Sequence, residues 1–478
     1  MKKAELAFVP FPVTSHITPA IDLAKLLVRH HDRLSITIVL MNPPFASSKT
    51  RAHLESLASN STIIDHRITL VLLPHDYTIP ETSDAHIINS TFIQNQITHL
   101  KHFLTNHINQ YSEPGHDSPQ LAGLVLDMLC APFMDVADEL GLPAYMFFTT
   151  SAGYSSLMFH IQIDAKDDPN AELVLPTFAN SIPSKVLPEF MLDKDVFSYY
   201  LNQFRRMKEK AKGFVINTFM ELEPHAIGSL VGATFPTVYT VGPLLNLAVE
   251  QSDSNVGSKD TTDDCDVIKW LDDQPPSSVV FLCFGHLGRF SEDQAKEIAN
   301  ALENSGIRFV WSLRQSKSGG YTDSMEALIK GFLNRNAGMG KIVEWAPQVA
   351  ILSHPAVRGF VSHCGWNSIL ESVWFGVPIA AWPLYAEQQI NAFEIVRDLG
   401  LAEEIRLDFF MDFQSQDAQA VVSAPQIEAG IRRVMEHDSD IRKNVKEISE
   451  KSRKALMNGG SSYNSIGHLI NDVFDNMA

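Results

Sequence analysis

Short apolar runs alternate with longer amphipathic stretches in both halves of the chain. In the first half, the runs expected to form strands are Leu6–Pro10, Ser35–Met41, Ile68–Leu73, Ala122–Leu126, Ala144–Phe148 and Gly213–Asn217. In the second half they are Ser278–Phe284, Arg308–Leu313, Lys341–Glu344, Val357–Val361 and Val377–Trp382. Strands that alternate with helices are typical of βαβ units in parallel sheets. The pattern therefore predicts an α/β protein with doubly wound parallel sheets.

The helices expected between these strands carry start signals of their own. Thr18 and Pro19 predict an N-cap and a first-turn proline for a helix that ends near Arg29. Ser291 and Gln294 have the spacing of a capping box. Further helices are expected from about Ile88 to Tyr111, after Ser368, from Glu387 to Leu399, from near Pro425 and after Ser462.

The length of 478 residues exceeds what one core usually supports, so two domains are expected. The polar stretch Glu250–Asp264 has the composition of a linker. We therefore predict an N-terminal domain at 1–249, a linker at 250–264 and a C-terminal domain at 265–458. Because doubly wound sheets bind ligands at the carboxyl ends of their strands, we expect the domains to face one another across a cleft.

Composition and charge narrow the class of protein. The formal charge of −18 disfavours nucleic acid or an anionic membrane as the main partner. The four cysteines show no metal-ligand spacing, which suits reduced thiols in the cytosol. Glu5, Pro10 and Pro12 interrupt the apolar start, and no apolar segment approaches the ~18 residues of a membrane span. A cytoplasmic protein is expected, with a monomer as the default.

The most specific motif is the unbroken stretch from Trp345 to Gln388. At its centre, His363, Asn367 and Ser368 stand where a strand gives way to an amphipathic segment. A helix N-terminus carries unpaired N–H groups and partial positive charge, so this point suits an anion such as a diphosphate. Spacing alone does not say which anion.

This stretch resembles the 44-residue signature of plant UDP-sugar-dependent glycosyltransferases. The resemblance covers nearly the whole chain, including the Pro-x-x-x-x-His segment before the first expected helix and the Val-Gly-Pro-Leu sequence at 241–244. It implies the GT-B architecture of two facing Rossmann-like domains, with the last helix, at 459–478, packed back on the N-terminal domain. It implies donor binding by Gly285, His286, Trp345, Ala346, Gln348, His363, Gly365, Trp366, Asn367, Ser368, Glu371, Tyr385, Glu387 and Gln388.

The resemblance also assigns roles. Trp345 matches the indole that stacks on uracil, and its aromatic face suits a planar base. Gln348 and Glu371 match residues that hydrogen-bond the ribose. The three residues at the expected helix N-terminus match the diphosphate contacts. The alternative is that each tryptophan is a core residue and His363 a satisfied buried histidine.

The last residues of this 44-residue stretch, 345–388, called the box below, bear on the choice of sugar. Glu387 and Gln388 match the pair that holds the sugar hydroxyls, and glutamine at the last position, together with Trp366, goes with glucose in the resembled family. One departure is His286, where the family usually has serine. It is either a harmless variant or a group that alters donor affinity and sugar choice.

The expected base stands near the N-terminus. His16 follows the first strand, and Asp127 ends a strand at the same edge of the same sheet. An imidazole can take a proton from a hydroxyl, and a carboxylate can hold its tautomer. Both positions match the catalytic pair of the resembled family, although Ser15 replaces its usual glycine. The alternative is a loop histidine and an aspartate that caps a helix. An apolar acceptor pocket is expected to use Phe11, Phe147 and Phe148, with residues of the helices after Ser151 and Ile182.

The resemblance implies inverting transfer of glucose from UDP-glucose to a hydroxyl of a small apolar acceptor, such as a phenolic or an alcohol. No cofactor beyond the co-substrate UDP-glucose is expected, and no metal. Asp-x-Asp occurs at 193–195, 264–266 and 438–440, but none of these ends an apolar strand. Three other classes stay open: a nicotinamide oxidoreductase, a sugar-nucleotide epimerase and a non-catalytic UDP-binding protein.

Overall fold

The computed structural model describes residues 3–43, 54–55, 65–74, 82, 85–111, 119–162, 168, 171–245, 261–314, 322–411 and 420–477. It has two compact units. The first contains residues 1–161, 194–246 and 454–478, and the second contains residues 162–193 and 247–453. Each unit is built on one large parallel sheet, as the alternation of apolar and amphipathic segments predicts.

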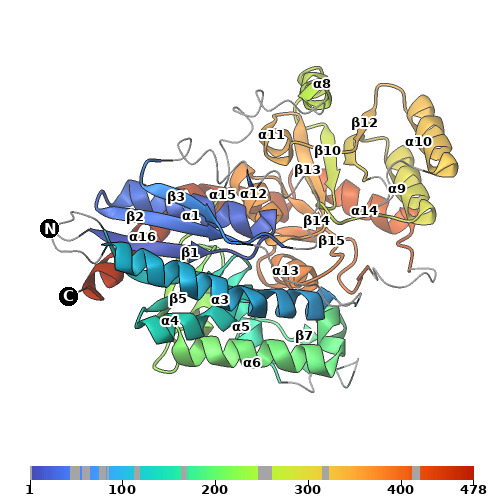
Figure 1. Ribbon diagram of the computed structural model, residues 1–478. Coiled ribbons are helices and arrows are strands. Elements are labelled where there is room, and N and C mark those ends of the chain that lie inside the picture. The colour runs from blue at the N-terminus through green and yellow to red at the C-terminus, as the bar shows by residue number, and fades with distance from the viewer. Residues whose placement is uncertain are drawn as a thin grey trace. The chain divides into compact units, whose positions relative to one another are not determined.

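The first unit has a seven-stranded parallel sheet within the described residues (Figure 1). In sheet order the strands are β3 (Ile68–Leu72), β2 (Leu34–Leu40), β1 (Ala4–Val9), β4 (Gln120–Asp127), β5 (Ala144–Phe148), β8 (Gly213–Ile216) and β9 (Thr237–Thr240). Its helices are α1 (Thr14–His30), α3 (Ala85–Tyr111), η2 (Met128–Phe133), α4 (Met134–Leu140), α5 (Ala152–His160), α6 (Lys194–Lys210), α7 (Pro224–Ser229) and α16 (Ser461–Asp475). Strand β9 was not among the predicted strands.

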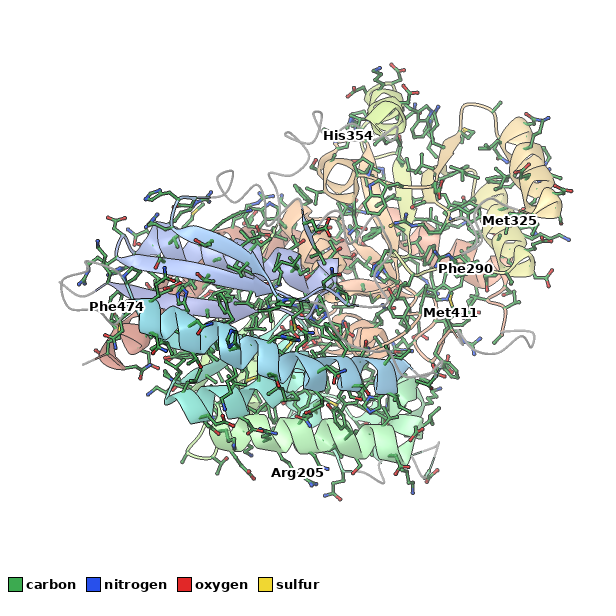
Figure 2. The ribbon with its side chains drawn as sticks, viewed as in Figure 1. Arg205, Phe290, Met325, His354, Met411 and Phe474 are labelled. Carbon is green, nitrogen blue, oxygen red and sulfur yellow. The ribbon has the colours of Figure 1, made fainter. Side chains whose placement is uncertain are left out.

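The last helix of the chain, α16, belongs to the core of this unit. Ile466, Leu469, Ile470 and Val473 pack with residues of β1, β2 and α1, and Figure 1 shows the helix (red) against the strands of the N-terminal region (blue). Phe474, labelled in Figure 2, packs against the same core. Since this segment lies more than 200 residues beyond β9 in the sequence, its apolar face is what brings it back to the first sheet.

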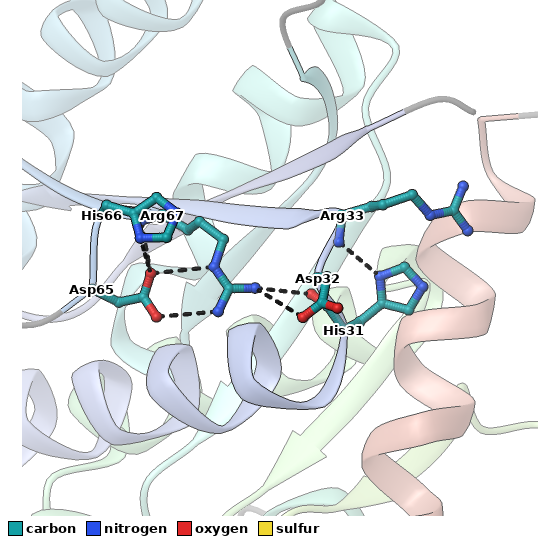
Figure 3. Close-up of polar contacts among 6 residues, drawn as sticks. All are labelled: His31, Asp32, Arg33, Asp65, His66 and Arg67. Carbon is teal, nitrogen blue, oxygen red and sulfur yellow. Dashed lines mark hydrogen bonds and ion pairs between the residues drawn. The ribbon is translucent and has the colours of Figure 1, made fainter.

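A network of polar contacts lies at the amino ends of the strands of the same sheet (Figure 3). The Arg67 guanidinium donates through Nε to Asp65 Oδ1 at 3.2 Å and through a terminal nitrogen to Asp65 Oδ2 at 3.1 Å. It also donates to the His31 carbonyl oxygen at 3.4 Å, between α1 and β2. These contacts join the starts of β2 and β3. They lie at the edge opposite to the carboxyl ends of the strands, so this cluster has a structural role.

The second unit has a six-stranded parallel sheet within the described residues. In sheet order the strands are β12 (Gly340–Val343), β11 (Arg308–Ser312), β10 (Val279–Cys283), β13 (Val357–Ser362), β14 (Ile379–Ala381) and β15 (Ala402–Glu404). The helices are α8 (Thr261–Asp272), α9 (Glu292–Ser305), α10 (Asp323–Arg335), α11 (Gln348–Ser353), α12 (Trp366–Phe375), α13 (Gln388–Phe393), the π-helix η7 (Glu394–Asp398), α14 (Ala424–Met435) and α15 (Asp440–Leu456), whose last residues belong to the first unit. Strand β15 was not predicted. Three residues labelled in Figure 2 belong to the apolar core of the second unit or pack against it: Met325, Met411 and Phe290.

The segment 162–193 lies in the second unit, whereas the sequence analysis placed it in a continuous N-terminal domain. It contains the two-stranded sheet β6 (Glu172–Leu173) with β7 (Ile182–Pro183), and the short helices η3 (Ser184–Val186) and η4 (Glu189–Leu192). The Asp398 carboxylate accepts hydrogen bonds from the backbone N–H groups of Ala179 and Asn180 at 2.9 and 3.2 Å. The Phe178 ring contacts Phe393 edge-on. These contacts are made by side chains distant in sequence, which periodicity does not reveal.

Two expected boundaries also differ. Helix α1 begins at Thr14, with Val13 as its N-cap, so Pro19 lies inside the helix and Thr18 is not a cap. The predicted linker falls at 250–260 outside the described residues, and 261–264 form the first turn of α8. Among the described residues, no helix has the length and apolar character needed to cross a membrane.

Candidate active site

The first unit places His16 and Asp127 where its strand order reverses. In open α/β sheets this point, beyond the carboxyl ends of the two central strands, is where ligands bind. The two strands here are β1 and β4, which pair in parallel. Asp127 is the last residue of β4, and His16 lies in the first turn of α1. The sequence analysis expected His16 in a loop, but the helix begins early enough to include it.

The two side chains are in direct contact. His16 Nδ1 lies 2.7 Å from Asp127 Oδ2, and Asp127 Oδ1 accepts a hydrogen bond from the backbone N–H of Leu129 at 2.9 Å. Because an ionised carboxylate can only accept, Nδ1 carries a proton, and in the neutral imidazole Nε2 then has the lone pair. Asp127 thus caps η2 and orients His16 at once, so the structural and catalytic interpretations of this residue are compatible.

Thr149 is a third polar group at this point that the sequence analysis did not single out. It follows β5, and its hydroxyl oxygen lies 3.2 Å from His16 Nδ1. Phe11 is also adjacent, with its ring centroid 5.9 Å from the imidazole. Phe147 and Phe148, expected in the acceptor pocket, are instead core residues: Phe147 belongs to the main apolar cluster, and Phe148 is fully buried.

The second unit places Gly285, His286 and His363 at the equivalent point of its own sheet. The strand order reverses between β10 and β13, which pair in parallel with Cys283 opposite Ser362. Gly285 and His286 follow β10, and His363 follows β13. A Cβ added at Gly285 would lie 2.6 Å from His363 Nε2, and one added at Gly365 would lie 2.7 Å from the same atom. The imidazole is therefore held between two glycine backbones.

The electrostatics of this point favour a neutral His363. Its side chain is buried, at 6% exposure, and burial together with the nearby His286 lowers its pKa to about 4. Burial, Arg314 and Arg289 also lower the pKa of His286. Near neutral pH, the buried His363 is therefore neutral and brings no full charge to the N-terminus of α12.

This buried histidine predicts acid sensitivity. Between its ordinary pKa of 6.5 and the folded value of about 4, the unfolded chain binds a proton that the folded chain does not, so stability falls as the pH is lowered. From pH 7 to pH 5 the wild type is expected to lose about 2 kcal/mol more unfolding free energy than His363→Gln, measured by chemical denaturation at both pH values. An equal loss in the two proteins would contradict a depressed pKa at this position.

The expected ribose and diphosphate residues are joined by hydrogen bonds. Gln348 Nε2 donates to Ser368 Oγ at 2.8 Å and to Glu371 Oε2 at 2.6 Å. Helix α12 begins at Trp366, with Gly365 as its N-cap, so Asn367 and Ser368 are its second and third residues. The structure thus brings together the amide from the first turn of α11 and the hydroxyl and carboxylate from the first two turns of α12.

The expected sugar-binding end of the box is ordered by Gln388. Its Oε1 accepts hydrogen bonds from the backbone N–H groups of Leu384 and Tyr385 at 3.0 and 3.1 Å. Burial raises the pKa of Tyr385 to about 12, and this ring lies 6.4 Å from that of His363. Glu387 is the N-cap residue of α13, next to Ala386, which has a positive φ of 57°. Gln388 therefore has a structural role in addition to the predicted sugar contact.

The tryptophans of the box differ in environment. Trp345, after β12, is 54% exposed, and the Arg314 guanidinium carbon lies 4.5 Å from the centroid of its ring. Trp366 and Trp382 are buried, at 3% and 0% exposure, and Ala346 is also buried. Arg314 was missed by the sequence analysis. Arg314 and Thr149 each come directly after a predicted strand. A search for polar residues at that position in the sequence would have found both.

Metal ligands do not converge at either point. Among the described residues, no group of three or more His, Cys, Asp or Glu side chains could hold a metal ion. Asp193 and Asp195 adjoin the start of α6, and Asp438 and Asp440 adjoin the start of α15. Metal independence itself stays a prediction.

These features define a class of protein. Two doubly wound units, one with a helix N-terminus suited to an anion and the other with a histidine–carboxylate pair, suit group transfer from a nucleotide-activated donor. Residues 217–418 match the family model described as "UDP-glucoronosyl and UDP-glucosyl transferase". The chain is 46% identical over 492 residues to UDP-glucose flavonoid 3-O-glucosyltransferase 6 of Fragaria ananassa, with 99% of each chain covered.

Solved structures agree with this match. A UGT transferase from Siraitia grosvenorii in complex with UDP is 40% identical with a TM-score of 0.82, over 99% of this chain and 100% of that chain. A UGT of Medicago truncatula complexed with UDP-glucose is 37% identical with a TM-score of 0.83, over 98% of both chains. The chain belongs to the plant UDP-glycosyltransferases and is an enzyme of that family with the GT-B fold. Its membership decides against the oxidoreductase, the epimerase and the non-catalytic binding protein.

Proposed function

We propose that this enzyme transfers glucose from UDP-glucose to a hydroxyl of a small, largely apolar acceptor, giving a β-glucoside and UDP. The observation that supports it most is the 2.7 Å contact between His16 and Asp127 where the strand order of the first sheet reverses. In a neutral histidine whose Nδ1–H is held by a carboxylate, the lone pair lies on Nε2, and this is the atom proposed to act as the base toward a hydroxyl.

The proposed reaction is a single displacement. His16 Nε2 takes the proton of the acceptor hydroxyl as its oxygen attacks the anomeric carbon of the sugar. The bond from that carbon to the diphosphate oxygen breaks on the opposite face, and its electron pair leaves with UDP. Attack opposite the leaving group inverts the configuration at the anomeric carbon.

The second unit is proposed to bind the donor. The uracil stacks on Trp345, and Gln348 and Glu371 bind the ribose. Charge that develops on the departing diphosphate is stabilised by the neutral His363 and by the first N–H groups of α12, which are already oriented before the reaction. Glu387 and Gln388 bind the glucose hydroxyls.

The acceptor is proposed to be a phenol of flavonoid type. The Fragaria relative is named for flavonoid 3-O-glucosylation, and a Phytolacca americana relative was solved with pterostilbene. Phe11 packs beside His16 at 5% exposure, and we propose that it borders the acceptor site. We also propose a cytoplasmic location, since the described Cys130, Cys283 and Cys364 are free thiols.

The test is incubation of the full chain with a panel of phenols and alcohols, using UDP-glucose with UDP-galactose in competition. We expect UDP and a hexoside product by mass, a β-linkage by NMR, and incorporation mainly of glucose. Turnover is expected to persist in EDTA. Release of UDP without any glycosylated product, or strict dependence on Mg²⁺, would count against the proposal.

A further inference from the structure

Arg314 lies at the carboxyl edge of the second sheet, among residues proposed to bind the donor. It follows β11, and Trp345 follows β12, the strand paired with β11 in parallel. Ser312 is opposite Val343, and the backbone N–H of Leu313 donates to the Val343 carbonyl oxygen at 2.9 Å. The register of the two strands therefore brings Arg314 beside Trp345.

The contact between the two side chains is a guanidinium over the indole ring. The guanidinium carbon is 4.5 Å from the ring centroid, well within the ~6 Å range of cation–π attraction. Trp345 is nevertheless 54% exposed, so much of the indole is open to a ligand. An exposed aromatic side chain has little packing to fix its orientation, and here a cation provides a contact on the ring itself.

Resting on the proposed function, we infer that Arg314 is a positioning residue of the donor site, whose guanidinium holds the Trp345 indole in the orientation that stacks on the uracil base. Arginine suits this role because its guanidinium is planar and always charged, whereas the lysine ammonium is a compact point charge on a flexible chain. In this role Arg314 acts on the base end of the nucleotide through Trp345, whereas a phosphate-binding cation acts on the diphosphate.

Binding of uridine and of UDP, followed by calorimetry with the full chain, tests the inference. Uridine carries the base and ribose without the diphosphate. Arg314→Met is expected to weaken the binding of both ligands by the same factor, roughly two- to tenfold. In a Trp345→Ala background, the same change is expected to have no further effect on either ligand. Arg314→Lys is expected to restore neither affinity fully.

Arg308→Met is the control, because Arg308 begins the same strand at the opposite edge of the sheet and should leave both affinities unchanged. Loss of UDP affinity with uridine affinity retained would overturn the inference and assign Arg314 to the diphosphate. Equal losses with and without Trp345 would also overturn it. A wild type that binds neither ligand would count against the proposed function, whereas unchanged affinities in Arg314→Met would count against the inference alone.

Discussion

Replacing His16 by alanine is expected to lower kcat on phenol and alcohol acceptors by roughly 10²- to 10⁴-fold, the range for loss of a general base. The reason is the arrangement at the carboxyl ends of β1 and β4, where Asp127 holds Nδ1, so that Nε2 is the atom proposed to take the hydroxyl proton. The KM for UDP-glucose is expected to change little, because the proposed donor contacts come from other residues. Steady-state kinetics with a single phenol, at varied concentrations of both substrates, measures the two effects separately.

The acceptor's own acidity sharpens this test. A thiol ionises unaided near neutral pH, so a thiol acceptor should lose much less rate than an alcohol in the same variant. His30→Ala is the matched control, since His30 lies in the last turn of the same helix, where its ring contacts Tyr463 of α16, and its loss reports structural damage to this unit without removal of the proposed base. An alcohol acceptor that reacts at the wild-type rate in His16→Ala would refute the role of His16 as base.

The sheet strands were the most predictable part of the fold. Parallel strands covered on both faces are continuous apolar runs, and all eleven predicted runs coincide with strands to within about two residues at each end. Within the two large sheets of the described residues, the strands missed are β9 and β15, which end their sheets and are only four and three residues long. Edge strands need fewer apolar residues, so the signal from burial is weaker there.

Sequence signals for helix starts were correct where the hydrogen bond is made within the same turn. They were incomplete where a side chain bonds to a residue distant in the sequence. Ser291 caps α9 as predicted, with its oxygen accepting from the backbone N–H of Gln294. The reciprocal half of the capping box is different: the Gln294 side chain instead exchanges two hydrogen bonds with the backbone of Val422, at 2.9 and 2.7 Å. A partner 128 residues away cannot be read from spacing.

The candidate site was predictable to the level of which residues follow which strands. His16, Asp127, His363 and Gly285 all lie at the reversals of strand order, as the rule for open α/β sheets requires. What the sequence could not show is which side chains contact each other. The contact of Arg314 with Trp345 depends on strand register, which fixes neighbours that no local pattern encodes.

The glycines around His363 lead to a second large effect. In Gly365→Ala the new Cβ would lie 2.7 Å from His363 Nε2, although the backbone φ of −62° suits any residue. The imidazole must then move, and displacement of a binding group by about 1 Å can reduce kcat/KM roughly 10²-fold. We expect a loss of that size in kcat/KM for UDP-glucose, with the acceptor KM unchanged and the melting temperature close to that of the wild type.

Gly285→Ala approaches the same nitrogen from the other side, and it adds backbone strain. Gly285 has a φ of +71°, which costs a residue with a Cβ about 1–2 kcal/mol, in addition to the 2.6 Å approach to Nε2. Gly306→Ala supplies the matched control: its φ is +63° at the end of α9, but no atom lies within 4 Å of the new Cβ. Gly306→Ala should therefore lose stability and keep its donor affinity, while Gly285→Ala loses both. If Gly365→Ala and Gly285→Ala both retained wild-type affinity for UDP, the placement of His363 between the two loops would have no part in donor binding.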